Sequence, residues 1–274
     1  MMSEVFRSDL FKLRKIRSFR VCLIVAFVLG LLMSVLYYIA WQELNKTMEE
    51  TLMYIESLGD YSKVVMEAMD VLPSDNLWSY VNVSLCDLNV LYIAAVVIGI
   101  FVGSEYSMGT IRNALTRGFS RNGVYFSKLT CAVIAMLLTV LSYTLGSFLS
   151  GCIMFGFTSS VPAGQMLLCI ALYALLFMAV ASFYSMLAVI TKRTGYAIAL
   201  AMLIPILVTA LINIIKIGNQ DFGNISRFWI FETITNTQKL VLSGEGYIPA
   251  ISGAIYLTLS STIGLVVFRK QSIS

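Results

Sequence analysis

The feature that most constrains this chain is the stretch of residues 129–191, which contains no charged side chain. A transmembrane helix needs about 20 mostly apolar residues, so this stretch has room for two helices, separated by the turn-forming residues Pro162 and Gly164. The whole composition agrees, since 58% of the 274 residues are hydrophobic and only 12% are charged, whereas about a quarter of an average soluble domain is charged. A soluble domain and a disordered chain are therefore both excluded.

Four more charge-free windows can each supply one membrane-spanning helix, and they cover residues 21–42, 88–104, 194–215 and 246–268. We therefore predict an all-α polytopic membrane protein with a single six-helix transmembrane domain at residues 19–268. The predicted spans are residues 20–41, 84–104, 127–154, 165–190, 196–216 and 248–268. The first apolar run is longer than the roughly 7–15 residues of a signal-peptide core, so it is predicted to be an uncleaved span.

The basic residues predict which side of the membrane each loop occupies. With six spans, all but five of the 19 lysines and arginines fall on one side, together with both chain ends. The five on the other side are Lys46, Lys63, Lys216, Arg227 and Lys239. Because loops rich in Lys and Arg lie on the cytoplasmic side, we predict that both termini, the loop 105–126 and the tail 269–274 are cytoplasmic.

Two segments outside the spans have a pattern of their own. Residues 1–18 are predicted to form a basic amphipathic helix in the cytoplasmic membrane interface, and the alternative is an unstructured basic flank. Its apolar face consists of Val5, Phe6, Leu10, Leu13 and Ile16. The outer loop 42–83 is acidic and its spacing predicts two short helices broken at Gly59-Asp60. That loop could cap the outer mouth or receive a cationic substrate, or it could be a solvated helical hairpin.

Several function classes are excluded by missing residues. The chain has no histidine, so it cannot hold the HExxH zinc motif or a Ser-His or Cys-His catalytic pair. It has no Gly-Lys pair and hence no phosphate-binding loop of the Walker A type. The five cysteines lie in or beside apolar stretches without a CxxC pattern, as buried apolar residues do. We therefore predict no catalytic residue, no metal site and no nucleic-acid partner.

The small residues Gly99 and Gly103 form a GxxxG pattern in the second predicted span. Such a pattern lets two helices pack closely in a membrane. The partner helix can belong to the same chain or to a second copy, and the spacing alone leaves both open.

The loop 105–126 has the clearest pattern of its own. On a helical wheel its apolar residues share one face and its polar residues share the other. The apolar face is Met108, Ile111, Ala114 and Leu115, and the polar face is Arg112, Asn113, Thr116 and Arg117. Gly118 is placed to end this helix, and Ser120 is placed to cap the next one. We predict a short amphipathic helix at residues 105–117, held at the cytoplasmic surface between two spans.

This loop resembles the cytoplasmic loop of ABC-2-type permeases, which carries a Glu, a Gly-Thr pair, a short helix, a Ser-Arg pair and a Lys that opens the next span. The matching residues here are Glu105, Gly109-Thr110, Ser120-Arg121 and Lys128. The pair Gly118-Phe119 stands where that family often has a proline. The six spans, the basic amphipathic start and the aromatic-bearing segment before the last span extend the resemblance over most of the chain.

The resemblance implies a non-catalytic permease subunit of an ATP-binding-cassette exporter in the plasma membrane of a bacterium. It implies two copies of a separate ABC ATPase subunit, which would carry the ATP and Mg, and a second permease subunit, identical or related. The substrate would be amphiphilic: a peptide, an antibiotic or a lipid-like molecule. The residues that would couple to the ATPase are Glu105, Gly109, Thr110, Arg112, Arg117 and Arg121.

Other roles remain open at this point. Arg112 and Arg117 could contact lipid headgroups, and Glu105 could stabilise a helix N-terminus. The alternative functions are an ion-coupled secondary carrier, a membrane protein that senses or gives immunity to antimicrobial peptides, and a membrane-embedded enzyme. A carrier would need buried carboxylates near the middle of a span, and the sequence places none there.

Overall fold

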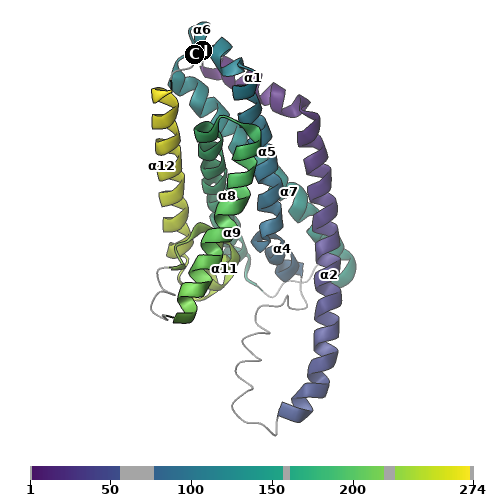
Figure 1. The fold of residues 1–274 in the computed structure, drawn as a ribbon. Coiled ribbons are helices and arrows are strands. Elements are labelled where there is room, and N and C mark those ends of the chain that lie inside the picture. Colours follow the sequence, from purple (N-terminus) through teal and green to yellow (C-terminus); the bar gives the residue numbers. More distant parts are fainter. Residues whose placement is uncertain (1, 56–76, 157–160, 219–225, 272–274) are drawn as a thin grey trace.

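The structure is a computed structural model that describes residues 2–55, 77–156, 161–218 and 226–271, where all regular secondary structure is helical (Figure 1). The helices are α1 (Met2–Lys15), α2 (Arg17–Ile55), α4 (Leu77–Cys86), α5 (Leu88–Ser107), α6 (Thr110–Thr116), α7 (Arg121–Phe155), α8 (Ala163–Thr191), α9 (Thr194–Gly218), α11 (Ile230–Leu242) and α12 (Tyr247–Lys270).

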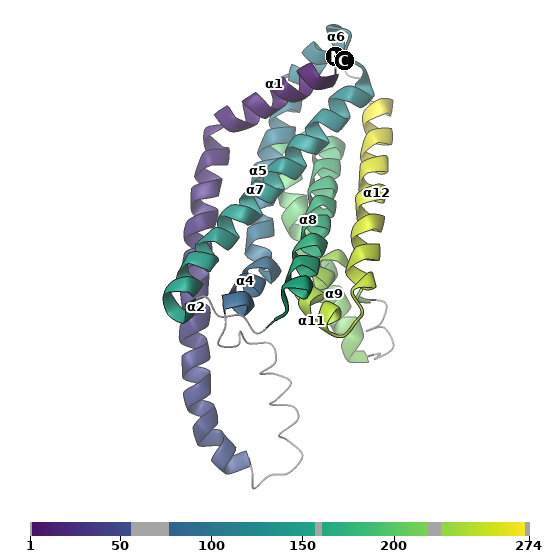
Figure 2. The same ribbon diagram turned by 180° about the vertical axis from the view of Figure 1, so that it is seen from behind.

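Within these described residues, six helices are long and apolar enough to cross a membrane: α2, α5, α7, α8, α9 and α12. This confirms the all-α class and the predicted number of spans. Figures 1 and 2 show the long helices side by side, with α1 and α6 at one end and α4 and α11 at the other. The start of α1 and the end of α12 lie at the same end as α6, as an even number of crossings requires.

The first candidate span ends at Ala40, close to the predicted end at residue 41, but its helix α2 continues to Ile55. Residues 42–55 contain no glycine or proline that would end it, so the described start of the predicted loop 42–83 continues α2 and is not a separate short helix. The predicted break at Gly59-Asp60 lies outside the described residues.

The second predicted span, residues 84–104, is divided at Asp87. The Asp87 carboxylate accepts a hydrogen bond from the Asn89 N–H at 2.9 Å and so caps the N-terminus of α5. The hydroxyl of Tyr143 on α7 also donates to Asp87. The short helix α4 therefore precedes α5 as a separate element.

Helix α11 occupies much of the segment between the last two spans. Its apolar residues Ile230, Phe231, Ile234 and Val241 are buried, where the helix packs against α8 and α12. This explains the density of apolar side chains in a helix of 13 residues, which is shorter than any of the six candidate spans.

Close helix contacts in the bundle depend on glycine. Helix α2 packs mainly against α7, and a Cβ atom at Gly146 would lie only 2.2 Å from the backbone oxygen of Phe27. At Gly99 and Gly103 an added Cβ would lie 2.5 Å from Ile198 Cγ1 and 2.8 Å from Thr194 Cα. Both glycines of the GxxxG pattern therefore face α9 of the same chain.

The outer faces of α2, α9 and α12 carry exposed apolar side chains, as lipid-facing helices do.

Candidate functional site

Helix α6 is held between two glycine joints. Gly109 has φ 66° and follows α5, while Gly118 has φ 85° and follows α6. A side chain at either position would meet nothing within 4 Å, so the left-handed backbone alone favours glycine there. Helix α7 then starts behind Ser120, whose hydroxyl accepts from the Gly123 N–H at 3.2 Å, as predicted for a cap.

The predicted single helix at 105–117 is wrong in its extent. Residues 105–107 are the last turn of α5, and the separate helix is Thr110–Thr116. The reason is the left-handed turn at Gly109, which breaks the helical path. Met108 therefore lies in the joint and is 66% exposed instead of sharing the apolar face.

The two faces of α6 otherwise follow the predicted wheel. Ile111 is buried at 2% exposure, and Ala114 and Leu115 pack against the core. Arg112, Asn113, Thr116 and Arg117 are exposed. The apolar side of α6 packs against the bundle, while the polar side is exposed on the surface of the protein.

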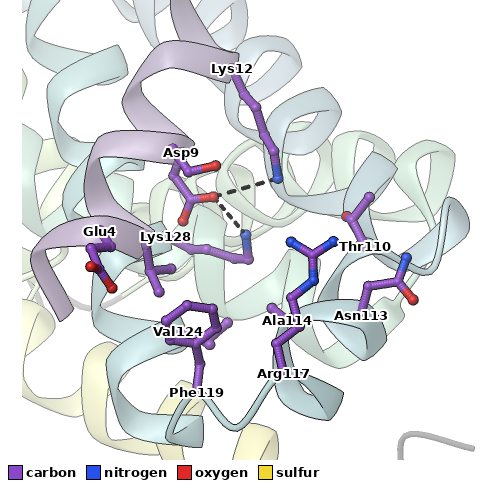
Figure 3. Close-up of a pocket in the computed structure, with 12 residues that line it drawn as sticks. Glu4, Asp9, Lys12, Thr110, Asn113, Ala114, Arg117, Phe119, Val124 and Lys128 are labelled. Atoms are coloured by element: carbon purple, nitrogen blue, oxygen red, sulfur yellow. Dashed lines mark hydrogen bonds and ion pairs between the residues drawn. The ribbon is translucent and has the colours of Figure 1, made fainter. Parts of the chain in front are cut away.

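A buried ion cluster lies directly beneath α6, and we define it as Asp9, Lys12, Glu105 and Lys128. The Lys128 ammonium contacts Glu105 Oε2 and lies 3.4 Å from Asp9 Oδ1. The Lys12 ammonium lies 3.4 Å from Glu105 Oε1. Ser127 Oγ donates to Asp9 Oδ2 at 2.7 Å. Figure 3 shows Asp9 with dashed lines to both lysines. Because Glu105 lies on α5 and pairs with the same two lysines, three helices, α1, α5 and α7, meet in this cluster.

The cluster is balanced in charge, and three of its four side chains are buried. The Asp9, Glu105 and Lys128 side chains are 3%, 7% and 9% exposed. The Lys12 side chain reaches in from the surface and is 45% exposed. Burying an ionised group costs several kcal/mol unless it is paired and hydrogen-bonded. Two carboxylates facing two ammonium groups satisfy that condition. The arrangement therefore holds α1 in one position against α5 and α7.

Asp9 and Lys12 belong to the ion cluster but were not among the residues that the sequence singled out, and Asp9 is the one that the sequence could have shown. It lies one helical turn from both Val5 and Leu13, and all three are buried against the bundle. The signal was present in the sequence, because a carboxylate at i+4 from one apolar residue and i−4 from another sits on the apolar face of the helix. Leu10, which was assigned to that face, is 38% exposed.

The predicted coupling residues fall into three groups, and the third consists of Arg121 alone. Glu105, Gly109 and Thr110 come together, since Thr110 Oγ1 donates to the Glu105 backbone oxygen at 3.2 Å across the Gly109 joint. Arg112 and Arg117 lie on the exposed face of α6.

Arg121 has a different setting from the other predicted coupling residues. Its guanidinium donates to the backbone oxygens of Arg269 at 2.6 Å and Gln271 at 2.9 Å. These carbonyls belong to the C-terminal end of α12, where they have no partner within the helix. Gln271 in turn donates to the Val189 oxygen of α8 at 2.8 Å. Arg121 therefore ties the start of α7 to α12 and α8.

Replacing Arg121 with glutamine should destabilise this end of the bundle. The change removes two charge-assisted hydrogen bonds, each worth about 1.5–3 kcal/mol, and we expect a net loss of about 2 kcal/mol because water reaches the freed carbonyls. The matched control is Arg112→Gln on exposed α6, for which we expect less than about 0.5 kcal/mol. Unfolding in detergent micelles measures both, and equal stabilities of the two variants would contradict the assignment.

A pocket of about 330 Å³ opens between α1, α6 and the start of α7. Its lining combines charged groups of the ion cluster with Arg117 of α6 and an apolar wall that includes Phe119 and Val124. Figure 3 shows the Arg117 guanidinium directed toward Lys12 and Lys128.

The sequence model of the DUF2705 family, described as a protein of unknown function, matches residues 51–274. The chain belongs to the DUF2705 family. No curated protein matches the chain. The DUF2705 match includes α6, Glu105, Ser127 and Lys128, while Asp9 and Lys12 precede it. In the ranges that the structure describes, no three metal-ligating side chains come together.

Proposed function

We propose that this chain is the permease subunit of an ABC exporter. Two permease subunits would form a pathway for an amphiphilic substrate in a bacterial plasma membrane, and a separate ABC ATPase would carry the ATP and Mg. The observation that carries this proposal is helix α6, which is fastened on one face, exposed on the other and joined to two spans through short glycine turns.

The contacts around α6 suggest how a push on it would be transmitted. A load on α6 would reach α5 through the bond from Thr110 to the Glu105 backbone and would reach α7 through the joint at Gly118. The ion cluster connects both spans to α1, and Arg121 connects the start of α7 to α12 and α8. A partner that moves α6 would therefore move most of this end of the bundle as one unit.

The charge on the exposed face of α6 indicates what kind of ATPase surface would bind this face. Arg112 is exposed and does not line the pocket beside α6. A basic side chain in this position suits an acidic groove on the ATPase, because complementary charges guide association and fix orientation.

An ion-coupled carrier has less support. In the described candidate spans, the one carboxylate is Glu105, which lies near the end of α5 and is paired with Lys128. A proton or sodium relay would need an ionisable group nearer the middle of a span.

The docking experiment uses the tagged full chain, co-expressed with an ABC ATPase from the bacterium that supplies the gene of this chain. We expect the ATPase to co-purify with the wild type, and Arg112→Glu to reduce the retained ATPase on the order of tenfold. The matched control is Lys270→Glu, which reverses an exposed cation at the same end of the bundle but on α12. The proposed docking face would be dismissed by equal retention in the wild type and Arg112→Glu.

A further inference from the structure

The pocket beside α6 contains more positive than negative charge near Arg117. Three cations, Lys12, Arg117 and Lys128, point toward the same space in Figure 3. Lys12 and Lys128 are paired with Asp9 and Glu105. Among the residues that the structure describes, no carboxylate pairs with Arg117. One cationic group therefore faces the pocket without a counter-charge.

The carboxylates at the pocket are not placed to supply that counter-charge. Asp9 already accepts from Ser127 and contacts both lysines. Glu4 also lines the pocket, but Figure 3 shows it on the opposite side from Arg117. An anion that enters from outside would meet the guanidinium of Arg117 and the half-exposed ammonium of Lys12.

The remaining lining indicates what kind of anion fits. A guanidinium offers parallel N–H donors that match two oxygens of a phosphate. Asn113 also lines the pocket, and Val5, Phe119 and Val124 form an apolar wall. A volume of about 330 Å³ accommodates a phosphate together with an organic group attached to it.

We infer that this pocket binds a phosphate group through Arg117 and Lys12. The phosphate can belong to the headgroup of an anionic phospholipid or to free phosphate. The surroundings favour the lipid, because Leu10 and Phe11 on α1 are 38% and 59% exposed, and a basic helix with exposed apolar side chains lies in the membrane interface. This inference does not depend on the ATPase.

The test measures binding to the purified full chain in a neutral detergent. The probes are short-chain phosphatidylglycerol, short-chain phosphatidylcholine and inorganic phosphate. We expect the wild type to bind phosphatidylglycerol above the phosphatidylcholine background, and Arg117→Gln to weaken this binding by about tenfold, the scale of a charge-assisted contact. Arg112→Gln is the matched control, since it removes an arginine from the same helix but outside the pocket, and it should bind as the wild type does.

The outcomes separate the sources of the phosphate and the rival explanations. Binding of inorganic phosphate alone, lost in Arg117→Gln, supports the phosphate site with a soluble source. Equal losses in Arg117→Gln and Arg112→Gln would overturn the inference, because they would show diffuse surface attraction. It would also be overturned if none of the three probes binds the wild type more tightly than it binds Arg117→Gln. Unfolding of Arg117→Gln in the same detergent confirms that the variant is folded.

Discussion

Replacing Lys128 with methionine is expected to cost about 3–5 kcal/mol of stability, the range for breaking a buried ion pair by removing one partner. Methionine keeps most of the side-chain length, so packing is largely preserved and the effect reports the charge. The loss is large because Glu105 and Asp9 would remain buried, and Lys12 alone would face two carboxylates. Unfolding in detergent micelles and the yield of folded protein both measure it.

The control for this prediction is Lys12→Met in the same cluster. Lys12 is 45% exposed, so water can take its place, and we expect a cost of no more than about 1 kcal/mol. A second variant tests the pairing itself. Adding Glu105→Gln to Lys128→Met removes one of the unpaired charges and should restore part of the lost stability. Equal stability of the Lys128 and Lys12 single variants would show that the cluster does not hold α1, α5 and α7 together.

Replacing Gly146 with alanine is expected to cost about 2–3 kcal/mol, which is typical of overpacking a tight contact. The added Cβ would lie 2.2 Å from the Phe27 oxygen and 2.9 Å from the Leu31 nitrogen. Both are backbone atoms, which cannot rotate away, so α2 and α7 would have to separate. That movement would also lengthen the bonds from Ser142 to the Leu23 oxygen and from Ser147 to the Gly30 oxygen, now 2.8 and 3.0 Å.

Gly195 offers a matched control, because it also lies in a helix but an added Cβ meets nothing within 4 Å. Gly195→Ala should leave stability unchanged or raise it by up to about 1 kcal/mol, since alanine favours helices more than glycine does. Comparable unfolding curves for Gly146→Ala and Gly195→Ala would mean that α2 and α7 do not approach as closely as described.

The sequence predicted features that depend on residues close together in the chain. Long charge-free runs must avoid water, so they identified all six candidate spans. The Ser120 cap and the two faces of α6 depend on spacings of three or four residues, and these were also predicted. The left-handed turn at Gly109 was not, because glycine is compatible with either hand and the pattern of residues 105–117 fits one continuous helix.

Contacts between distant residues could not be predicted in the same way. Asp9 and Lys128 are separated by most of α1, α2 and α5, and their pairing depends on how those helices pack. Arg121 was grouped with the coupling residues because of its place in a motif. Its guanidinium also donates to backbone oxygens at the end of α12, and this contact forms only once α7 and α12 lie side by side. The family match adds no function to these contacts, so their roles rest on geometry.

The most direct test of the proposed function is transport by the reconstituted chain with and without its ATPase. Vesicles would contain either the chain alone, under a proton or sodium gradient, or the chain with the ABC ATPase and ATP, each tested with a panel of labelled amphiphilic peptides. We predict peptide movement only in the second case, and its loss in Arg112→Glu but not in Lys270→Glu. Steady movement by the chain alone under an ion gradient would contradict the account.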